Sequence, residues 1–278
     1  MSSGLATGVV TKIAPGVRRL LAPNAGPMTG PGTNTYLLGE EEVAVIDPGP
    51  VIDSHIDAIN SAAPARITWI LVTHTHPDHS PAARKLAENT GAALLGPAAP
   101  DSGHQDRSFV PDRVLWDGDL FETAEFTLRV VHTPGHASNH LCYRHEQLDW
   151  LFTGDHIMNG STVVINPPDG NMKHYLQSLA RLKTLELKIL APGHGELIDN
   201  PDAAVDSLID HRLGREAKII AALEARPGST TKQLTPLVYD DVDAALRGLA
   251  QRSLLAHLIK LEQDGRVGQR EKSWRLIL

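Results

Sequence analysis

Four side chains that can bind a metal ion stand within a run of six residues, namely His74, His76, Asp78 and His79. Imidazole is the most common transition-metal ligand near neutral pH, and a carboxylate adds a hard oxygen. Pro77 interrupts the run, so a regular helix cannot continue through it. A solvated histidine-rich turn is the alternative interpretation. It is disfavoured because residues of the same types recur downstream in similar settings.

Three further candidate ligands each follow an apolar segment and stand near glycine or proline: His136, Asp155 and His194. Such neighbours let the backbone turn sharply and bring side chains to one edge of a sheet. Seven ligands are too many for one tetrahedral ion. They suit two divalent ions about 3.5–4 Å apart that share a carboxylate. Asp155 is the candidate bridge, because an aspartate can give one oxygen to each ion.

Two other residues have more than one interpretation. Asp47 ends an apolar run at 43–46, just before a Pro-Gly-Pro turn. It is either a surface turn cap or a group that orients metal-binding histidines. The single cysteine, Cys142, cannot form an intramolecular disulfide, and we expect an inert core thiol there rather than a ligand or nucleophile.

The candidate ligands need a scaffold that brings distant segments together. Alternating apolar patterns and turn residues predict this scaffold. We expect strands at 9–13, 17–21, 33–38, 43–46, 67–72, 92–95, 114–120, 126–131, 139–143, 149–152 and 189–190, with helices at 53–63, 81–91 and 174–184. On the first helix, His55 is expected to face solvent. Strands that alternate with helices and end in reactive residues indicate a layered α/β (α+β) architecture.

The character of the sequence changes near residue 200. We expect helices at 202–226, 230–238 and 243–264, followed by a hairpin at 265–277, which is the order of elements in a winged helix. Residues 1–200 contain 14 Lys and Arg against 22 Asp and Glu, whereas residues 201–278 contain 12 against 11. We therefore predict a catalytic domain over 1–200 and a helical, winged-helix domain over 201–278.

The composition limits the classes of partner. The chain has 278 residues and a net charge of −7, which argues against non-specific nucleic-acid binding by bulk charge. It has no basic and apolar leader at its start and no uninterrupted apolar window long enough for a membrane helix. We therefore expect a cytoplasmic protein that does not contact a membrane. A homodimer is compatible with the sequence.

The ordered set Asp47, the His-x-His-x-Asp-His run, His136, Asp155 and His194 closely resembles the five motifs of the metallo-β-lactamase superfamily. The resemblance covers residues 10 to 200. It implies an αβ/βα sandwich with the metals at the edge between two sheets. It also implies a division of the ligands. The first ion would be held by His74, His76 and His136, the second by Asp78, His79 and His194, with Asp155 as the bridge.

This resemblance implies two divalent ions, with zinc favoured and iron or manganese compatible with the mixed N and O ligands. Two cations lower the pKa of a bound water, so that a metal-bound hydroxide can attack a carbonyl carbon or a phosphorus near neutral pH. Asp78 can position that hydroxide and take a proton. The expected chemistry is hydrolysis.

Outside the metal motifs, the chain is similar to the β-lactamase-like protein 2 group within that superfamily. The similarity rests on the runs 154–164 and 211–216 and on the winged-helix pattern at 254–267. In place of the Gly-Gly that many superfamily members have after the cluster, this chain has Ser80 and Pro81 followed by two alanines. The group implies a metal-dependent endoribonuclease that cleaves single-stranded RNA, and this is our first expectation.

Two alternatives stay open. One is a hydrolase of small thioesters, such as coenzyme A or glutathione conjugates. The other is a non-enzymatic nucleic-acid-binding protein that uses the winged helix, although such a protein has no need of seven intact ligands. A deep apolar tunnel beside the metals would favour the thioesterase, and a wide basic groove leading to Arg215 would favour the nuclease. On the helix at 243–264, Arg247, Arg252 and Lys260 could form a nucleic-acid face, or the domain could serve packing or dimerisation.

Several residues are candidates for substrate contact, each with a structural alternative. His140 could donate a proton to the leaving group or contact a phosphate, or be a hydrogen-bonded core histidine. Thr33 and Asn34 could line the mouth of the site. His211 and Arg215 share a helix face at a spacing of four residues, so they could meet a phosphate or form a surface pair.

Overall fold

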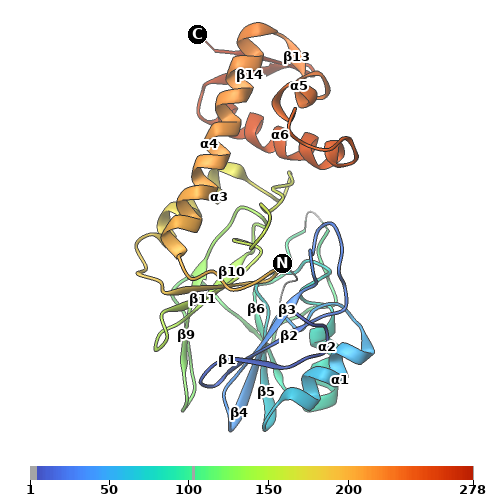
Figure 1. Cartoon of the computed structure of the whole chain (residues 1–278), viewed down its shortest axis with the longest axis vertical. Helices are drawn as coiled ribbons and strands as arrows, with labels where there is room; N and C mark the ends of the chain where they lie inside the picture. The colour runs from blue at the N-terminus through green and yellow to red at the C-terminus, as the bar shows by residue number, and fades with distance from the viewer. Residues whose placement is uncertain (1–4, 102–103, 278) are drawn as a thin grey trace.

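The computed structural model describes residues 5–101 and 104–277, and its larger part is a sandwich of two sheets with helices outside (Figure 1). The first sheet contains, in spatial order, β1 (Thr11–Ala14), β2 (Val17–Leu21), β3 (Asn34–Leu38), β4 (Glu42–Ile46), β5 (Arg66–Leu71), β6 (Ala93–Gly96) and β7 (Arg113–Val114). The second contains, also in spatial order, β12 (Ile189–Pro192), β11 (Trp150–Gly154), β10 (Leu141–His145), β9 (Thr127–His132) and β8 (Leu120–Glu122). The expected αβ/βα sandwich is confirmed.

Strands β4, β5 and β6 of the first sheet are mostly apolar on both faces because both faces are covered. They pair in parallel, and α1 (Asp53–Ala62) and α2 (Ala82–Thr90) form crossovers between them. Successive side chains point to opposite faces of a strand. Thus Ile46 and Leu71 pack into the core between the sheets, whereas Val45 and Ile70 pack against the helices.

The second sheet follows the same rule. On β10, Leu141 and Tyr143 face the core between the sheets, and the intervening Cys142 faces outward. Helices α3 (Met172–Leu182) and α4 (Pro201–Ala225) cover that outer face. Cys142 is fully buried, and burial raises the pKa of its thiol to about 12, as expected for an inert core thiol.

The topology brings the ends of five strands to one edge of the sandwich. In the first sheet β4 and β5 run in parallel, and in the second β9, β11 and β12 share one direction. The two sheets meet at this edge, where the Asn34 backbone N–H donates to the Gly193 carbonyl at 2.7 Å. Every segment that carries a candidate metal ligand leaves a strand here.

The C-terminal part contains β13 (Ser229–Thr230), α5 (Thr231–Val238), the 3-10 helix η1 (Ala244–Leu246), α6 (Arg247–Gln263), β14 (Val267–Arg270) and β15 (Ser273–Leu276). These elements enclose a separate core around Trp274, which is 1% exposed. Helix α4 connects the two cores, because Val205 packs on the second sheet and Ile219 packs in the C-terminal core. Figure 1 shows α4 running from the sandwich into this upper unit. The predicted boundary near residue 200 stays a prediction.

The structure corrects three expectations about individual elements. His55 is only 1% exposed rather than solvent-facing, because α1 turns it onto the sheet, where its Nε2 lies 2.9 Å from Thr35 Oγ1. The expected strand at 114–120 is divided, since a turn separates β7 from β8. The expected helix at 243–264 begins only at Arg247 and is preceded by η1.

Helix α4 is 25 residues long, which is enough to cross a lipid bilayer. Its sequence is nevertheless interrupted throughout by charged residues, among them Asp206, Arg212 and Glu216. Across residues 5–101 and 104–277, none of the helices is both long and apolar enough to span a membrane.

Candidate metal centre

The first ligand group consists of three histidines from two loops. His74 and His76 follow β5, and His136 follows β9. The Nδ1 atom of His76 lies 3.0 Å from Nε2 of His74 and 2.9 Å from Nε2 of His136. Three ring nitrogens therefore converge on one point, as the ligands of a single ion do.

The second group lies beside the first. Asp155 Oδ1 is 3.3 Å from His79 Nε2 and 3.2 Å from His194 Nε2, and Asp78 Oδ2 is 3.3 Å from the same His194 nitrogen. The other carboxylate oxygen of Asp155 faces the first group, 3.6 Å from His136 Nε2. Asp155 thus directs one oxygen to each group, as a bridging carboxylate does.

The donor atoms fit divalent cations. Within the second ligand group, three buried atoms have no hydrogen-bond partner among the described residues: His79 Nε2, His194 Nε2 and Asp155 Oδ1. Unpartnered buried polar atoms are costly and rare in folded proteins. A cation held by all three would satisfy them at once. The mixture of imidazole and carboxylate ligands suits zinc, iron or manganese.

A second layer of hydrogen bonds orients the histidine rings. The Nδ1 atoms of His79, His136 and His194 contact, respectively, Asp47 Oδ2 at 2.9 Å, the Val164 carbonyl at 2.7 Å and the Gly32 carbonyl at 3.0 Å. A proton on each Nδ1 leaves the Nε2 lone pair free for a metal.

Asp47 has a buried position at the end of β4. It is 2% exposed, which excludes the alternative of a surface turn cap. Its carboxylate accepts hydrogen bonds from the Thr73 backbone N–H at 2.7 Å and from the Thr73 hydroxyl at 2.8 Å, in addition to its contact with His79. Asp47 therefore connects the end of β4 to the loop that carries four ligands.

The electrostatics of the metal-free centre reflect the close spacing of its charges. Burial alone would lower the pKa of His79, but Asp155, Asp78 and Asp47 outweigh it and raise the pKa well above its usual value. Burial opposes a raised pKa at His194 too, yet Asp155 raises that pKa to about 10. The pKa of Asp155 is well below its usual value, because the two histidines outweigh its burial. Metal binding would therefore release protons from this group.

Glycine is required beside the centre. A Cβ atom on Gly193 would lie 2.7 Å from His79 Cε1 and 3.0 Å from Asp155 Oδ1. Such a contact is too close, so any side chain at this position would displace the ligands. The Pro-Gly-His sequence that precedes Gly195 is thus explained by the close approach of the backbone.

His140 lies behind the centre. It is fully buried, its Nε2 accepts a hydrogen bond from the Asp155 backbone N–H at 3.1 Å, and its Nδ1 lies 2.9 Å from Thr133 Oγ1. Burial and the neighbouring His156 lower its pKa well below the usual value. It does not line the cavity described below. This position fits the structural alternative, in which His140 holds Asp155, better than proton donation to a leaving group.

Thr33 and Asn34 are also buried rather than at a mouth. The Asn34 side chain donates to the carbonyls of Pro192 at 2.9 Å and Gly195 at 2.8 Å, which fixes the loop of His194. Thr33 Oγ1 accepts a hydrogen bond from Asn24. The residues just before this segment that line the cavity are Pro27, Met28 and Thr29, which no pattern in the sequence predicted.

The structure separates His211 and Arg215 from the metal centre. His211 is exposed, and neither residue lines the cavity. Arg215 forms an ion pair with Asp241, with distances of 2.8 and 3.1 Å, and its guanidinium lies 4.2 Å from the centre of the Tyr239 ring. The groove expected to lead from the metals to Arg215 is therefore not formed by this pair.

Arg212, which sequence reasoning missed, is the arginine of α4 that contacts the segment next to His136. It is 3% exposed and donates a hydrogen bond of 2.6 Å to the Val163 carbonyl. Its guanidinium also lies 5.3 Å from the centre of the Tyr175 ring. The adjacent Val164 carbonyl is the one that orients His136.

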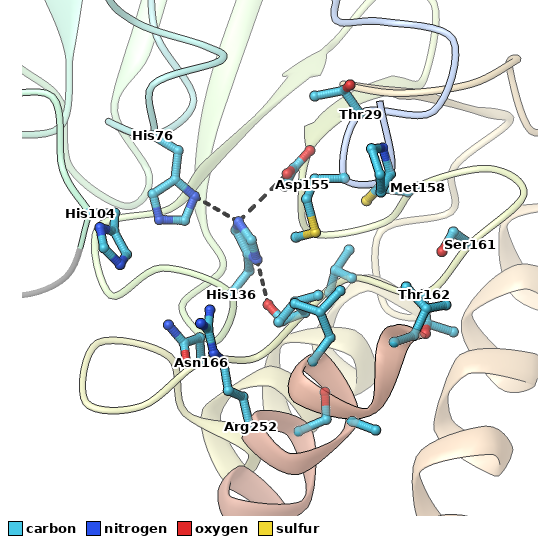
Figure 2. A pocket seen from close by; sticks show the side chains of 18 of the residues that line it. Thr29, His76, His104, His136, Asp155, Met158, Ser161, Thr162, Asn166 and Arg252 are labelled. Atoms are coloured by element: carbon cyan, nitrogen blue, oxygen red, sulfur yellow. Dashed lines mark hydrogen bonds and ion pairs between the residues drawn. The ribbon is translucent and has the colours of Figure 1, made fainter. Parts of the chain in front are cut away.

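A cavity of about 620 Å³ opens beside the metal ligands (Figure 2). His76, Asp78, His136 and Asp155 lie on one side of it. Three segments, 28–29, 158–164 and 242–250, form what we call the apolar wall of this cavity. The wall contains Met28, Met158, Val163, Val242, Leu246 and Leu249. The C-terminal unit therefore forms part of the wall.

Comparison with known proteins agrees with this geometry. The family model of the metallo-beta-lactamase superfamily matches residues 28–194, which contain all seven candidate ligands. The chain belongs to this superfamily. A second family model, the beta-lactamase associated winged helix domain, matches residues 230–274. The expected winged helix is thus confirmed.

Relatives of this superfamily member match nearly its whole length. A beta-lactamase-like protein 2 homolog from Caenorhabditis elegans is 32% identical over 92% of this chain and 87% of its own. An atrochrysone carboxyl ACP thioesterase from Aspergillus novofumigatus is 30% identical over 93% of this chain and 82% of its own. Among solved structures, a beta-lactamase domain protein from Burkholderia ambifaria has a TM-score of 0.85 at 21% identity, covering 99% of this chain and 96% of its own. The chain is accordingly a metal-dependent hydrolase similar to the β-lactamase-like protein 2 group.

Proposed function

We propose that this hydrolase cleaves thioesters whose acyl group is apolar. The observation that carries the proposal is the apolar wall, which faces the metal ligands across one cavity. Apolar walls with a few convergent polar groups are typical of small-molecule sites. They bind an acyl chain by removing its surface from water, and they offer little to a chain of phosphates.

The charges of the cavity favour a thioester over RNA. Among the residues that line it, Arg252 is the single Lys or Arg. Arg215 is paired with Asp241, and Lys260 is paired with Glu216 at 2.7 Å and with Asp264 at 3.0 Å. Binding of single-stranded RNA usually needs a positively charged groove and stacking aromatic rings. Cleavage of RNA, our first expectation from the sequence, therefore has less support than thioester hydrolysis. The name of the Aspergillus relative, a thioesterase, is consistent with this order.

The residues have separate tasks in this proposal. His74, His76 and His136 would hold one ion, Asp78, His79 and His194 the other, and Asp155 both. When bound, two divalent ions supply Lewis acidity and lower the pKa of a water near them. Zinc is our proposal for both ions.

Asp78 is suited to handle the proton. Its side chain is 26% exposed and lines the cavity. Burial would raise the pKa of its carboxyl group, but His79 and a hydrogen bond with His194 outweigh burial and lower that pKa, so the carboxylate is ionised. It can accept the proton of a water whose oxygen attacks the acyl carbonyl carbon. The carbon–sulfur bond then breaks and the proton passes from Asp78 to the sulfur, which leaves a thiol and a carboxylic acid that loses its own proton to solvent.

The test compares three substrates with metal-loaded protein: an octanoyl thioester of N-acetylcysteamine, the acetyl thioester, and a single-stranded RNA oligonucleotide. We expect turnover of both thioesters, faster for octanoyl, and no RNA cleavage above that of the His76→Ala variant purified in parallel. RNA cleavage that the variant lacks, together with intact thioesters, would reject the proposal and restore the endoribonuclease.

A further inference from the structure

We propose, on the basis of the thioesterase function above, that Arg252 binds a carboxylate carried by the acyl group of the substrate. Arg252 belongs to the second turn of α6, in the winged-helix unit, and lines the cavity together with His136 and Asn166. Figure 2 shows its side chain extending from α6 towards these two residues. The substrate class is thus an apolar acyl thioester with an anionic substituent.

The guanidinium of Arg252 is available for a ligand. No hydrogen bond or ion pair connects it to any of the residues in 5–101 and 104–277. The other arginines of the C-terminal unit that lie near the sandwich are paired. Arg215 contacts Asp241, and Arg212 donates to the Val163 carbonyl. Arg252 is exposed to solvent where it lines the cavity, and its planar guanidinium can bind a carboxylate with two parallel hydrogen bonds.

The acidic residues that line the cavity have partners other than Arg252. Asp78 and Asp155 belong to the candidate metal centre, and Asp169 accepts hydrogen bonds from the Ser138 hydroxyl at 2.5 Å and from Gln105 at 3.1 Å. With two divalent ions in place, the centre would be positive as well. The cavity therefore favours a substrate with negative charge in addition to its apolar surface.

The position of Arg252 assigns that charge to the acyl group. A carboxylate is planar and matches the fork of a guanidinium with two parallel hydrogen bonds. The amide of Asn166 adds a possible donor at the same end of the cavity. The phosphates of a coenzyme A or carrier-protein thioester are separated from the sulfur by the whole pantetheine arm. Arg252 and the metal ligands line one cavity, so a carboxylate on the acyl group can meet the guanidinium while the reacting carbonyl lies at the metal ligands.

The experiment uses a pair of N-acetylcysteamine thioesters of 3-phenylpropionate, one unsubstituted and one with a carboxylate on the ring. We measure kcat/KM for both substrates with the metal-loaded wild type, Arg252→Gln and Arg252→Lys. The expected ratio, carboxylated over neutral, falls about tenfold or more in Arg252→Gln, as for a lost hydrogen-bonded charge pair. Arg252→Lys should retain part of the preference for the carboxylated substrate. The control Arg247→Gln, on the same helix but outside the cavity, should keep the wild-type ratio.

A second comparison shows whether Arg252 binds a carboxylate on the acyl group or a phosphate of coenzyme A. The coenzyme A thioester of neutral 3-phenylpropionate is compared with its N-acetylcysteamine thioester. If Arg252→Gln lowers kcat/KM selectively for the coenzyme A thioester, a phosphate is the ligand and the acyl carboxylate is rejected. An unchanged ratio in the first comparison, with both thioesters hydrolysed, would also reject it and leave the thioesterase function standing.

A binding measurement covers the case in which no thioester is hydrolysed. Calorimetry with metal-free protein compares 3-(carboxyphenyl)propionate with 3-phenylpropionate. We expect the dicarboxylate to bind the wild type at least tenfold more tightly than it binds Arg252→Gln. Equal affinities of the wild type and Arg252→Gln for the dicarboxylate would reject the Arg252 subsite, whether or not the protein hydrolyses thioesters. RNA cleavage that depends on Arg252, without thioester turnover, would reject both this inference and the proposed function.

Discussion

Arg212 of α4 donates a 2.6 Å hydrogen bond to the carbonyl of Val163, in the segment that crosses the metal centre. The next carbonyl in the chain, that of Val164, accepts the hydrogen bond from His136 Nδ1. A helix that continues into the winged-helix unit thereby fixes a candidate metal ligand of the sandwich. The winged helix and the catalytic layer are joined through the outer partners of the metal, and not only through apolar packing.

Removal of this hydrogen bond should weaken metal binding. In Arg212→Met the apolar length of the side chain is kept and the donor is lost, so the segment of Val164 orients the His136 ring less firmly. We expect metal affinity to fall by up to about 10-fold, at the low end of the loss for a group that itself hydrogen-bonds a ligand, because Arg212 acts through the neighbouring peptide. Competition with a chromophoric chelator measures this. Lys218→Met, which removes exposed ion pairs with Asp240 and Asp241 from the same helix, serves as the control. Equal affinities in both variants would show that Arg212 does not position His136.

The two ligand groups should be separable by mutation. His74→Ala removes one nitrogen from the group around His136, whereas His194→Ala removes one from the group around Asp78. Each variant should bind one ion where the wild type binds two, and Asp155→Ala should weaken both sites. Elemental analysis of the purified proteins gives the stoichiometry. Chelation of the wild type should abolish hydrolysis, and added metal should restore it. Two tightly bound ions in His194→Ala would contradict the assignment.

His55 should make the fold sensitive to acid. Burial lowers its pKa from 6.5 to about 4, so below pH 6.5 the unfolded chain binds a proton that the folded protein does not bind. The stability that this group contributes is therefore present above pH 6.5 and lost as the pH falls towards 4. On acidification from pH 7 to 4.5, metal-free His55→Gln should lose about 2 kcal/mol less free energy of unfolding than wild type. Denaturant titration measures this, and His174→Gln, which changes an exposed histidine, should behave as wild type. Identical losses in His55→Gln would show that His55 is protonated in the folded state.

The apolar wall should determine the preferred acyl length. Leu249 lines the cavity from the winged-helix unit, so Leu249→Ala removes a contact with a long acyl chain but none with an acetyl group. We expect kcat/KM for the octanoyl thioester to fall about tenfold, from the loss of roughly 1–2 kcal/mol of apolar contact. The kcat/KM for the acetyl thioester should change by less than about twofold, because an acetyl group makes no contact with Leu249. Leu213→Ala, which truncates an exposed leucine of α4 outside the cavity, is the control. An equal loss on both thioesters would place the octanoyl chain elsewhere.

The sequence was sufficient to single out the seven candidate ligands, because metal-binding residue types recur just past apolar strands and near glycine or proline. The fold brings these residues into two adjacent groups, and their role as ligands stays a prediction. The pattern of helices followed by a hairpin was likewise sufficient for the winged helix, which the family comparison confirms. Both are local features, since they depend on residue types and on spacings along a short stretch of chain. The superfamily follows from them.

The tertiary structure decided which of the remaining polar residues reach the centre. Arg212 and Arg215 are three residues apart on one helix, and only tertiary contacts show that Arg212 bonds to Val163, next to the carbonyl that orients His136, whereas Arg215 pairs with Asp241. His55 is buried because α1 packs against β3, which its amphipathic spacing did not reveal. The cavity is formed by segments around Met28, by 158–164 and by 242–253, which are far apart along the chain. Contacts across such separations depend on how whole elements pack, so the apolar wall and Arg252 could not be placed from the sequence.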